Sequence, residues 1–108
     1  MSFISFEDFK KLKIRIGKVV EVIDHPKADK LYVLRVDFGD ESRTIVAGIK
    51  PWYSREELLN KYIAVIVNLE PKTIRGVTSE GMLLAADDGE TVSILTIDKP
   101  VKLGAIVH

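Results

Sequence analysis

The residues with the clearest capacity for chemistry are two cations, Lys72 and Arg75, in a short polar segment between two apolar ones. This segment leaves an apolar run at Asn68, reaches a turn signal at Gly76 and returns to apolar sequence at Met82. Lysine neutralises a phosphate as a point charge, whereas arginine can bond it through two parallel N–H groups. A cationic loop between two strands therefore predicts a contact with nucleic acid.

Two further cations, Lys27 and Lys30, lie in a second segment that reads as a loop. Pro26 removes a backbone donor there and disfavours the helical region for His25. From the sequence alone, solvation at the surface and contact with phosphate are equally good interpretations of these two lysines. His25 is interpreted as a loop histidine without a metal, because tight metal sites need several converging ligands.

Three uncharged residues around the first segment each allow two roles. Asn68 ends a strand of Ile and Val, where a buried residue is expected, so its amide either fixes nearby backbone, which we favour, or contacts a ligand. Ser79 either caps the turn of the loop or contacts a phosphate. Met82 is interpreted as core filler in preference to the lining of an adaptable surface.

The sequence offers little for catalysis. His25 and His108 are the only histidines, no nucleophile motif or phosphate loop is present, and no cysteine is available. Asp87 and Asp88 are adjacent and precede Gly89, so a solvated turn is favoured over an acid/base pair. We predict a non-enzyme with no catalytic residue, no metal site and no cofactor.

Composition predicts one globular domain, residues 1–108, with 46% hydrophobic and 30% charged residues. The formal net charge is zero, which argues against a generic polyanion binder and leaves local charge clusters to attract any ligand. The start of the chain does not resemble a secretory signal, and no apolar run could span a bilayer. We therefore expect a cytoplasmic protein without membrane contact.

Hydrophobic periodicity predicts strands with few helices. Gly17 suggests a bulge or bend in the first strand, and Trp52 and Tyr53 suggest a plug for one barrel end in preference to a base-stacking platform. Strands are expected over 14–24, 31–38, 43–47, 62–69 and 81–86, short strands over 92–97 and 101–107, and short helices from 5 to about 12 and from 54 toward 62. A closed barrel removes sheet edges, and a helix between the third and fourth of five strands is typical of the OB-fold.

Five segments in this order resemble the tRNA-binding domain family: residues 6–9, 15–19, 25–31, 43–49 and 68–82. That family includes free-standing structure-specific tRNA-binding proteins, the C-terminal domain or separate β subunit of methionyl-tRNA synthetase, and related export chaperones. The resemblance implies an all-β, five-stranded OB-fold barrel with short helices and N- and C-terminal extensions. It implies binding of tRNA by shape, at the corner of the L. The chain looks like a free-standing member, and differs from the usual pattern at Thr73, where lysine is common, and at Ala47, where serine is common.

Seven apolar residues near the two ends exceed what five strands need, and the resemblance implies a homodimer built from these ends. The expected tRNA-binding residues are Lys27, Lys30, Asn68, Lys72, Arg75, Ser79 and Met82, and the expected dimer interface is Phe3, Ile4, Phe6, Val101, Leu103, Ile106 and Val107. We expect shape-specific tRNA binding by a homodimer, with methionyl-tRNA synthetase as a candidate partner. The alternative is an export-related chaperone that binds unfolded polypeptides on the same dimeric barrel.

Overall fold

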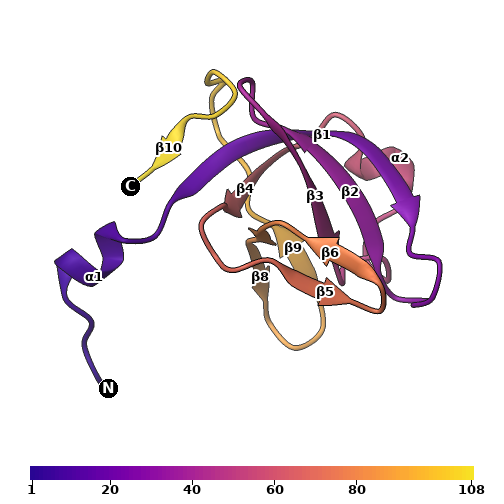
Figure 1. The fold of residues 1–108 in the computed structure, drawn as a ribbon, viewed down its shortest axis with the longest axis horizontal. Helices are drawn as coiled ribbons and strands as arrows, with labels where there is room; N and C mark the ends of the chain where they lie inside the picture. The colour runs from indigo at the N-terminus through magenta and orange to yellow at the C-terminus, as the bar shows by residue number, and fades with distance from the viewer.

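The structure, a computed structural model, describes residues 1–108 and is built around one antiparallel barrel (Figure 1). The main sheet has the order β3-β2-β1-β4-β7. Its strands are β1 (Ile14–Asp24), β2 (Tyr32–Asp37), β3 (Ser42–Ala47), β4 (Tyr62–Ile66) and β7 (Met82–Leu83). The all-β, OB-like architecture predicted from the sequence is confirmed.

The barrel closes where β3 meets the segment that precedes β7. The backbone N–H of Val46 donates to the Ser79 hydroxyl at 2.9 Å, and Glu80 N–H donates to the Thr44 carbonyl at 2.8 Å. These bonds satisfy backbone groups that an open sheet would leave exposed at its edge.

Three short pieces of sheet extend this barrel. One hairpin pairs β5 (Lys72–Ile74) with β6 (Val77–Ser79), and a second pairs β8 (Ala85–Asp87) with β9 (Val92–Ile94). The last strand, β10 (Ile106–Val107), pairs with the beginning of β1. Both termini consequently lie on the same side of the barrel (Figure 1).

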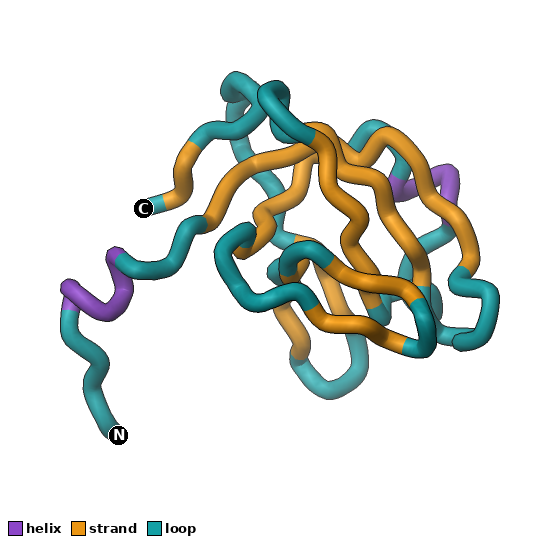
Figure 2. Tube along the Cα trace, in the orientation of Figure 1, coloured by secondary structure: helices purple, strands orange, loops and turns teal.

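The two helices are short and begin at serine caps, as the sequence predicts (Figure 2). Helix α1 (Phe6–Lys10) follows Ser5, whose hydroxyl accepts from Asp8 N–H, and α2 (Arg55–Leu58) follows a complete capping box at Ser54. Helix α2 ends earlier than expected because Leu59 is already extended and Asn60 has a φ of 71°.

The apolar residues form two clusters on opposite faces of β1 and β4. The larger one fills the barrel and includes Val19, Leu34 and Phe38, all fully buried. The smaller one joins Ile14, Ile16, Ala64 and Ile66 under the C-terminal tail, with Leu84, Ile97 and Ala105 packed against it. Strand β4 is therefore buried on both faces, as its continuous apolar sequence predicts.

Three local predictions are wrong. The irregularity of β1 lies between Val19 and Glu21, not at Gly17. Gly17 instead allows close packing, because a Cβ there would lie 2.5 Å from Val36 Cγ1. The region 81–86 is not one buried strand but two short ones, and Met82 is 46% exposed. Met82 is thus not core filler.

Of the two aromatic residues after Pro51, only Tyr53 packs into the barrel, as favoured from the sequence. Tyr53 packs against the larger cluster, its hydroxyl accepts from Ile94 N–H at 3.0 Å, and its carbonyl accepts from the Tyr32 hydroxyl at 2.7 Å. Trp52 donates its indole N–H to the Glu90 carbonyl at 3.0 Å and remains 40% exposed.

No helix has the length and apolar character needed to cross a bilayer.

Candidate nucleic-acid interface

The β5–β6 hairpin presents Arg75 at its tip through a tight two-residue turn. Ile74 pairs with Val77, so Arg75 and Gly76 form the turn, with φ values of 48° and 90°. Positive φ at both positions defines the type I′ turn, whose twist matches that of the strands. Such a φ is uncommon for an arginine, and unusual backbone of this kind clusters at functional sites.

Ser79 anchors the base of this hairpin to the barrel. Its hydroxyl accepts from Val46 N–H and donates to the Gly81 carbonyl, each at 2.9 Å, and the residue is 5% exposed. Both functions of the hydroxyl are therefore used within the fold. This geometry favours the turn-capping role of Ser79 over contact with a phosphate.

A buried histidine joins the hairpin to the loop between β1 and β2. His25 Nε2 lies 2.8 Å from the Ile74 carbonyl oxygen, and Lys27 N–H donates to His25 Nδ1 at 3.0 Å. The carbonyl can only accept, so the neutral ring carries its proton on Nε2. The Arg75 guanidinium also approaches the Lys27 carbonyl oxygen, at 3.4 Å. The loop and the hairpin meet at one end of the barrel (Figure 2).

Three of the predicted cations surround the hollow where the two segments meet, which we call the loop hollow. It has a volume of about 380 Å³ and is lined by Lys27, Ala28, Asp29, Lys30, Leu31 and Arg75. Its three cations make no ion pair, and neither does Lys72 on β5. Their charge is therefore free to attract an anionic ligand.

Lys72 and Met82 border a second, neighbouring space, the hairpin groove. Its volume is about 280 Å³, and its lining is Val46, Leu69, Glu70, Lys72, Ile74, Ser79, Gly81 and Met82. Four of these residues are apolar, and Lys72 and Glu70 add one cation and one carboxylate. Apolar residues in such a groove can accept a nucleobase or an aliphatic side chain.

Asn68 serves the N-terminal segment instead of the hairpin. Its Oδ1 accepts from Lys13 N–H at 2.8 Å and its Nδ2 donates to the Lys11 carbonyl at 2.6 Å. The side chain thus fixes the connection between α1 and β1. The residue is exposed, contrary to the expected burial, and the geometry favours its structural role.

Sequence reasoning missed two residues, one in the first loop and one on β2. His25 was interpreted as an ordinary loop residue, although its position directly before Pro26 in an otherwise charged loop was the available signal. Arg35 is exposed on β2 and donates to the Thr44 hydroxyl at 3.1 Å, beside the point where Glu80 closes the barrel. Its outward position follows from the alternation along β2.

Two other arginines are held in carboxylate networks. Arg15 bonds Asp40 at 3.0 Å and Glu41 at 3.3 Å, and its Nε donates to the Gly104 carbonyl at 3.1 Å. The hydrogen bond from Arg15 lowers the pKa of the Asp40 carboxyl. Arg43 bonds Glu41 at 2.8 Å. Arg15 thus ties the β2–β3 turn to the tail, and both arginines are less available to a ligand.

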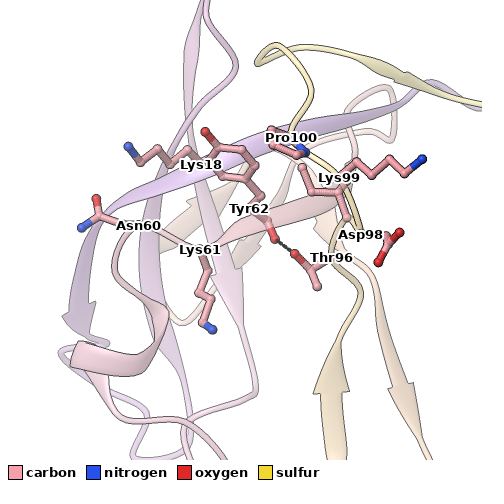
Figure 3. A pocket seen from close by; sticks show the side chains of 9 residues that line it. Lys18, Asn60, Lys61, Tyr62, Thr96, Asp98, Lys99 and Pro100 are labelled. Atoms are coloured by element: carbon pink, nitrogen blue, oxygen red, sulfur yellow. Dashed lines mark hydrogen bonds between the residues drawn. The ribbon is translucent and has the colours of Figure 1, made fainter.

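A third hollow, the tail hollow, lies between β4 and the segment after β9 (Figure 3). It has a volume of about 500 Å³ and is lined by Lys18, Asn60, Lys61, Tyr62, Thr96, Ile97, Asp98, Lys99 and Pro100. Figure 3 shows the ammonium groups of Lys18, Lys61 and Lys99 pointing in three different directions. A compact anion needs converging donors, which this arrangement does not supply.

The predicted dimer residues lie at the two ends of the chain, on the side away from α2 (Figure 1). Phe3, Ile4 and Phe6 are 91%, 72% and 69% exposed, and α1 buries none of its residues. Val101, Ile106 and Val107 are also exposed, whereas Leu103 is half-buried.

Comparison with known proteins adds a family and several relatives. The family model described as "Putative tRNA binding domain" matches residues 14–106. A methionine–tRNA ligase of Pyrococcus horikoshii is 63% identical over 108 residues, and that of Pyrococcus furiosus is 64% identical over the same length. The chain matches over 100% of its own length but spans only 15% of each of these curated relatives.

Solved structures share the whole architecture. A MetRS-related protein from Pyrococcus horikoshii superposes with a TM-score of 0.94 at 37% identity, covering 100% of both chains. The chaperone CsaA from Bacillus anthracis superposes with a TM-score of 0.93 at 28% identity, covering 99% of this chain and 100% of the other.

Proposed function

Because the chain belongs to the tRNA-binding domain family, we propose that it binds tRNA through its two cationic loops and does so without catalysis. The single observation that carries the proposal is the loop hollow. Lys27, Lys30 and Arg75 meet there without ion pairs, on two segments that one buried histidine holds together.

Binding would rest on contact with the phosphate backbone. Cations that neutralise phosphates release counterions, which supplies affinity without reading the sequence. Loops fixed at a set separation select among folded RNAs by shape, since base edges in an RNA helix are poorly accessible. The zero net charge of the chain restricts this attraction to the face that carries the free cations.

A homodimer is the second part of the proposal. Phe3, Ile4 and Phe6 are exposed on an arm that stands off the barrel, and β10 is paired on one edge only. Two-fold pairing is the commonest way to bury such a patch. Two barrels would then offer two sets of cationic loops to one tRNA, which raises avidity. Light scattering at micromolar concentration should report the dimer, and a monomer would contradict it.

A methionyl-tRNA synthetase is the partner that we propose for this binding. Two relatives that match over the full length of this chain are methionine–tRNA ligases, and the chain spans 15% of each. A tRNA-binding module beside a synthetase raises the effective concentration of tRNA at the enzyme.

A chaperone function is the second candidate, favoured by the hairpin groove and by the similarity to chaperone CsaA. The apolar lining of the groove, with Leu69 and Met82 exposed at its edge, would accept an aliphatic side chain of an unfolded polypeptide.

One binding experiment separates the two functions. We expect purified protein to shift folded tRNA in a native gel at lower concentration than an RNA hairpin of equal charge or a denatured polypeptide. Preference for the denatured polypeptide would replace the first function with the second. Equal binding of tRNA and of the hairpin would remove the selection by shape.

A further inference from the structure

We propose that His25 is a positioning residue that sets the separation of the two cationic loops and releases the β5–β6 hairpin when its ring takes a second proton. This role rests on the proposed tRNA binding for its consequence, although the latch itself can be tested without RNA. His25 touches no ligand in this proposal and acts through Lys27 and Arg75.

The chemistry of the neutral imidazole fits the position. One ring nitrogen must donate, to the Ile74 carbonyl at 2.8 Å, while the other must accept, from Lys27 N–H at 3.0 Å. A neutral imidazole offers one donor and one acceptor on opposite sides of a rigid ring. The ring is 5% exposed, so water cannot readily replace either partner.

These contacts decide where the tip of the hairpin lies. The base of the hairpin is anchored by Ser79 to β3. Two side-chain hydrogen bonds join the tip to the first loop. The His25 ring donates to the Ile74 carbonyl, and Arg75 makes the longer bond, 3.4 Å, to the Lys27 carbonyl. Loss of the His25 bond would leave the loop hollow bridged by the longer contact alone.

A second proton removes the acceptor. Imidazolium donates from both nitrogens, so Nδ1–H would face Lys27 N–H without an acceptor. A cation with an unpaired N–H is costly to bury, so the charged ring would leave its site, and its bond to the Ile74 carbonyl would break with it. The added charge would join Lys27 and Lys30 on its own loop and Arg75 on the hairpin, with Asp29 as the one carboxylate lining that hollow. The preceding carboxylate, Asp24, is already bonded to Lys50 at 3.1 Å.

The direction of the pH effect separates a latch from simple electrostatics. A histidine that merely adds charge near RNA strengthens binding when it is protonated. A latch weakens binding, because the cations of the two loops no longer share one geometry. We therefore expect tRNA affinity to fall about three- to tenfold as the pH is lowered from about 8 to about 5, the effect of one or two lost hydrogen bonds.

The test measures tRNA affinity between pH 5 and 8, a range of about three units in which histidines titrate, with the His25 ring followed by NMR. His25→Asn retains an acceptor for Lys27 N–H, and His25→Gln retains a donor toward Ile74. Both should bind tRNA about threefold more weakly at pH 8, roughly one hydrogen bond, and lose the pH dependence. His108→Gln, at the exposed C-terminus, should retain the wild-type profile.

Three results would overturn the latch. Affinity could rise on acidification, the pH profile could persist in both His25 variants, or both could bind like wild type. If tRNA does not bind at all, the proposed function fails, and NMR still decides the latch through the Nε2–H signal and the separation of residues 27 and 75. Persistence of both after protonation would reject it. The wild-type pH series keeps the test intact if a variant does not fold.

Discussion

The loop hollow and the tail hollow each carry three lysines or arginines without ion pairs, yet the chain holds them differently. In the loop hollow, Arg75 sits on a type I′ turn and a buried histidine ties that turn to the lysine loop. In the tail hollow, Lys18 lies on β1, Lys61 directly precedes β4 and Lys99 is in the tail, and their ammonium groups diverge (Figure 3).

The difference teaches that charge alone does not define a binding site here. The tail hollow is the larger of the two and carries as many cations, but its side chains would have to be ordered by the ligand. Ordering a long side chain costs about 0.5–1.5 kcal/mol on binding. The loop hollow has its backbone fixed before the ligand arrives, so more of its electrostatic attraction remains as affinity.

The largest expected effect comes from removing two cations of the interface. Lys72→Ala with Arg75→Ala should weaken tRNA binding by about 1–3 kcal/mol and make its salt dependence shallower, because fewer counterions are released. The loss should be similar for different tRNA sequences, since phosphate contacts do not read bases. Filter binding at several salt concentrations measures both quantities, and an unaltered affinity and salt slope in a folded variant would move the polypeptide-binding alternative ahead.

The next effect tests geometry without changing charge. Gly76→Ala should lower the free energy of unfolding by about 1–2 kcal/mol, because φ is 90° there, and should weaken tRNA binding severalfold by re-aiming Arg75. Gly89→Ala is a matched control: its φ is 93°, and at both glycines an added Cβ meets nothing within 4 Å. Denaturant unfolding should report similar losses for the two variants. Equal tRNA affinity of the two would show that the turn does not position the site.

A smaller effect is expected at the tail hollow. Lys18→Ala with Lys61→Ala removes the same net charge as the interface variant, so generic attraction predicts the same loss of affinity. We expect a change below about 0.5 kcal/mol, the size of screened and unpositioned surface charges. A loss equal to that of the interface variant, measured in the same salt series, would break the comparison between the two hollows.

The alternation of apolar and polar residues in strands, together with helix-capping serines, made most of the fold predictable. Tyr32, Leu34, Val36 and Phe38 alternate and are all buried, and Ser5 and Ser54 begin the helices where expected. The failures have a common physical cause in tertiary packing. The bulge at Val19–Glu21 and the tight packing over Gly17 depend on neighbouring strands, which a single strand sequence does not reveal.

The candidate site was predictable in its charges and not in its connections. The loop sequence indicates Lys27, Lys30, Lys72 and Arg75 as cations between strands, and their contact with tRNA stays a prediction. The roles of His25 and Asn68 depend on partners 49 and 55 residues away in sequence. Such long-range hydrogen bonds leave no local pattern, so sequence reasoning left two roles open for Asn68 and interpreted His25 as a loop histidine without a metal.

The smallest expected effect lies in the acidic turn between β8 and β9, which shares no lining residue with either hollow. Asp88 accepts hydrogen bonds from Thr91 N–H at 2.8 Å and Glu90 N–H at 2.9 Å, and these bonds lower the pKa of its carboxyl below the ordinary 3.8. A carboxyl whose pKa is lower in the folded than in the unfolded state stabilises the fold at pH values above its unfolded-state pKa. This stabilisation is lost as the pH falls through the folded-state pKa. Asp87→Asn with Asp88→Asn should therefore unfold slightly more easily at neutral pH, and the difference from wild type should vanish in acid. Affinity for tRNA should stay unchanged or improve slightly, because the two anions that are removed line neither the loop hollow nor the hairpin groove. A clear loss of tRNA affinity in this variant would place the acidic turn, and not the loop hollow alone, in the interface.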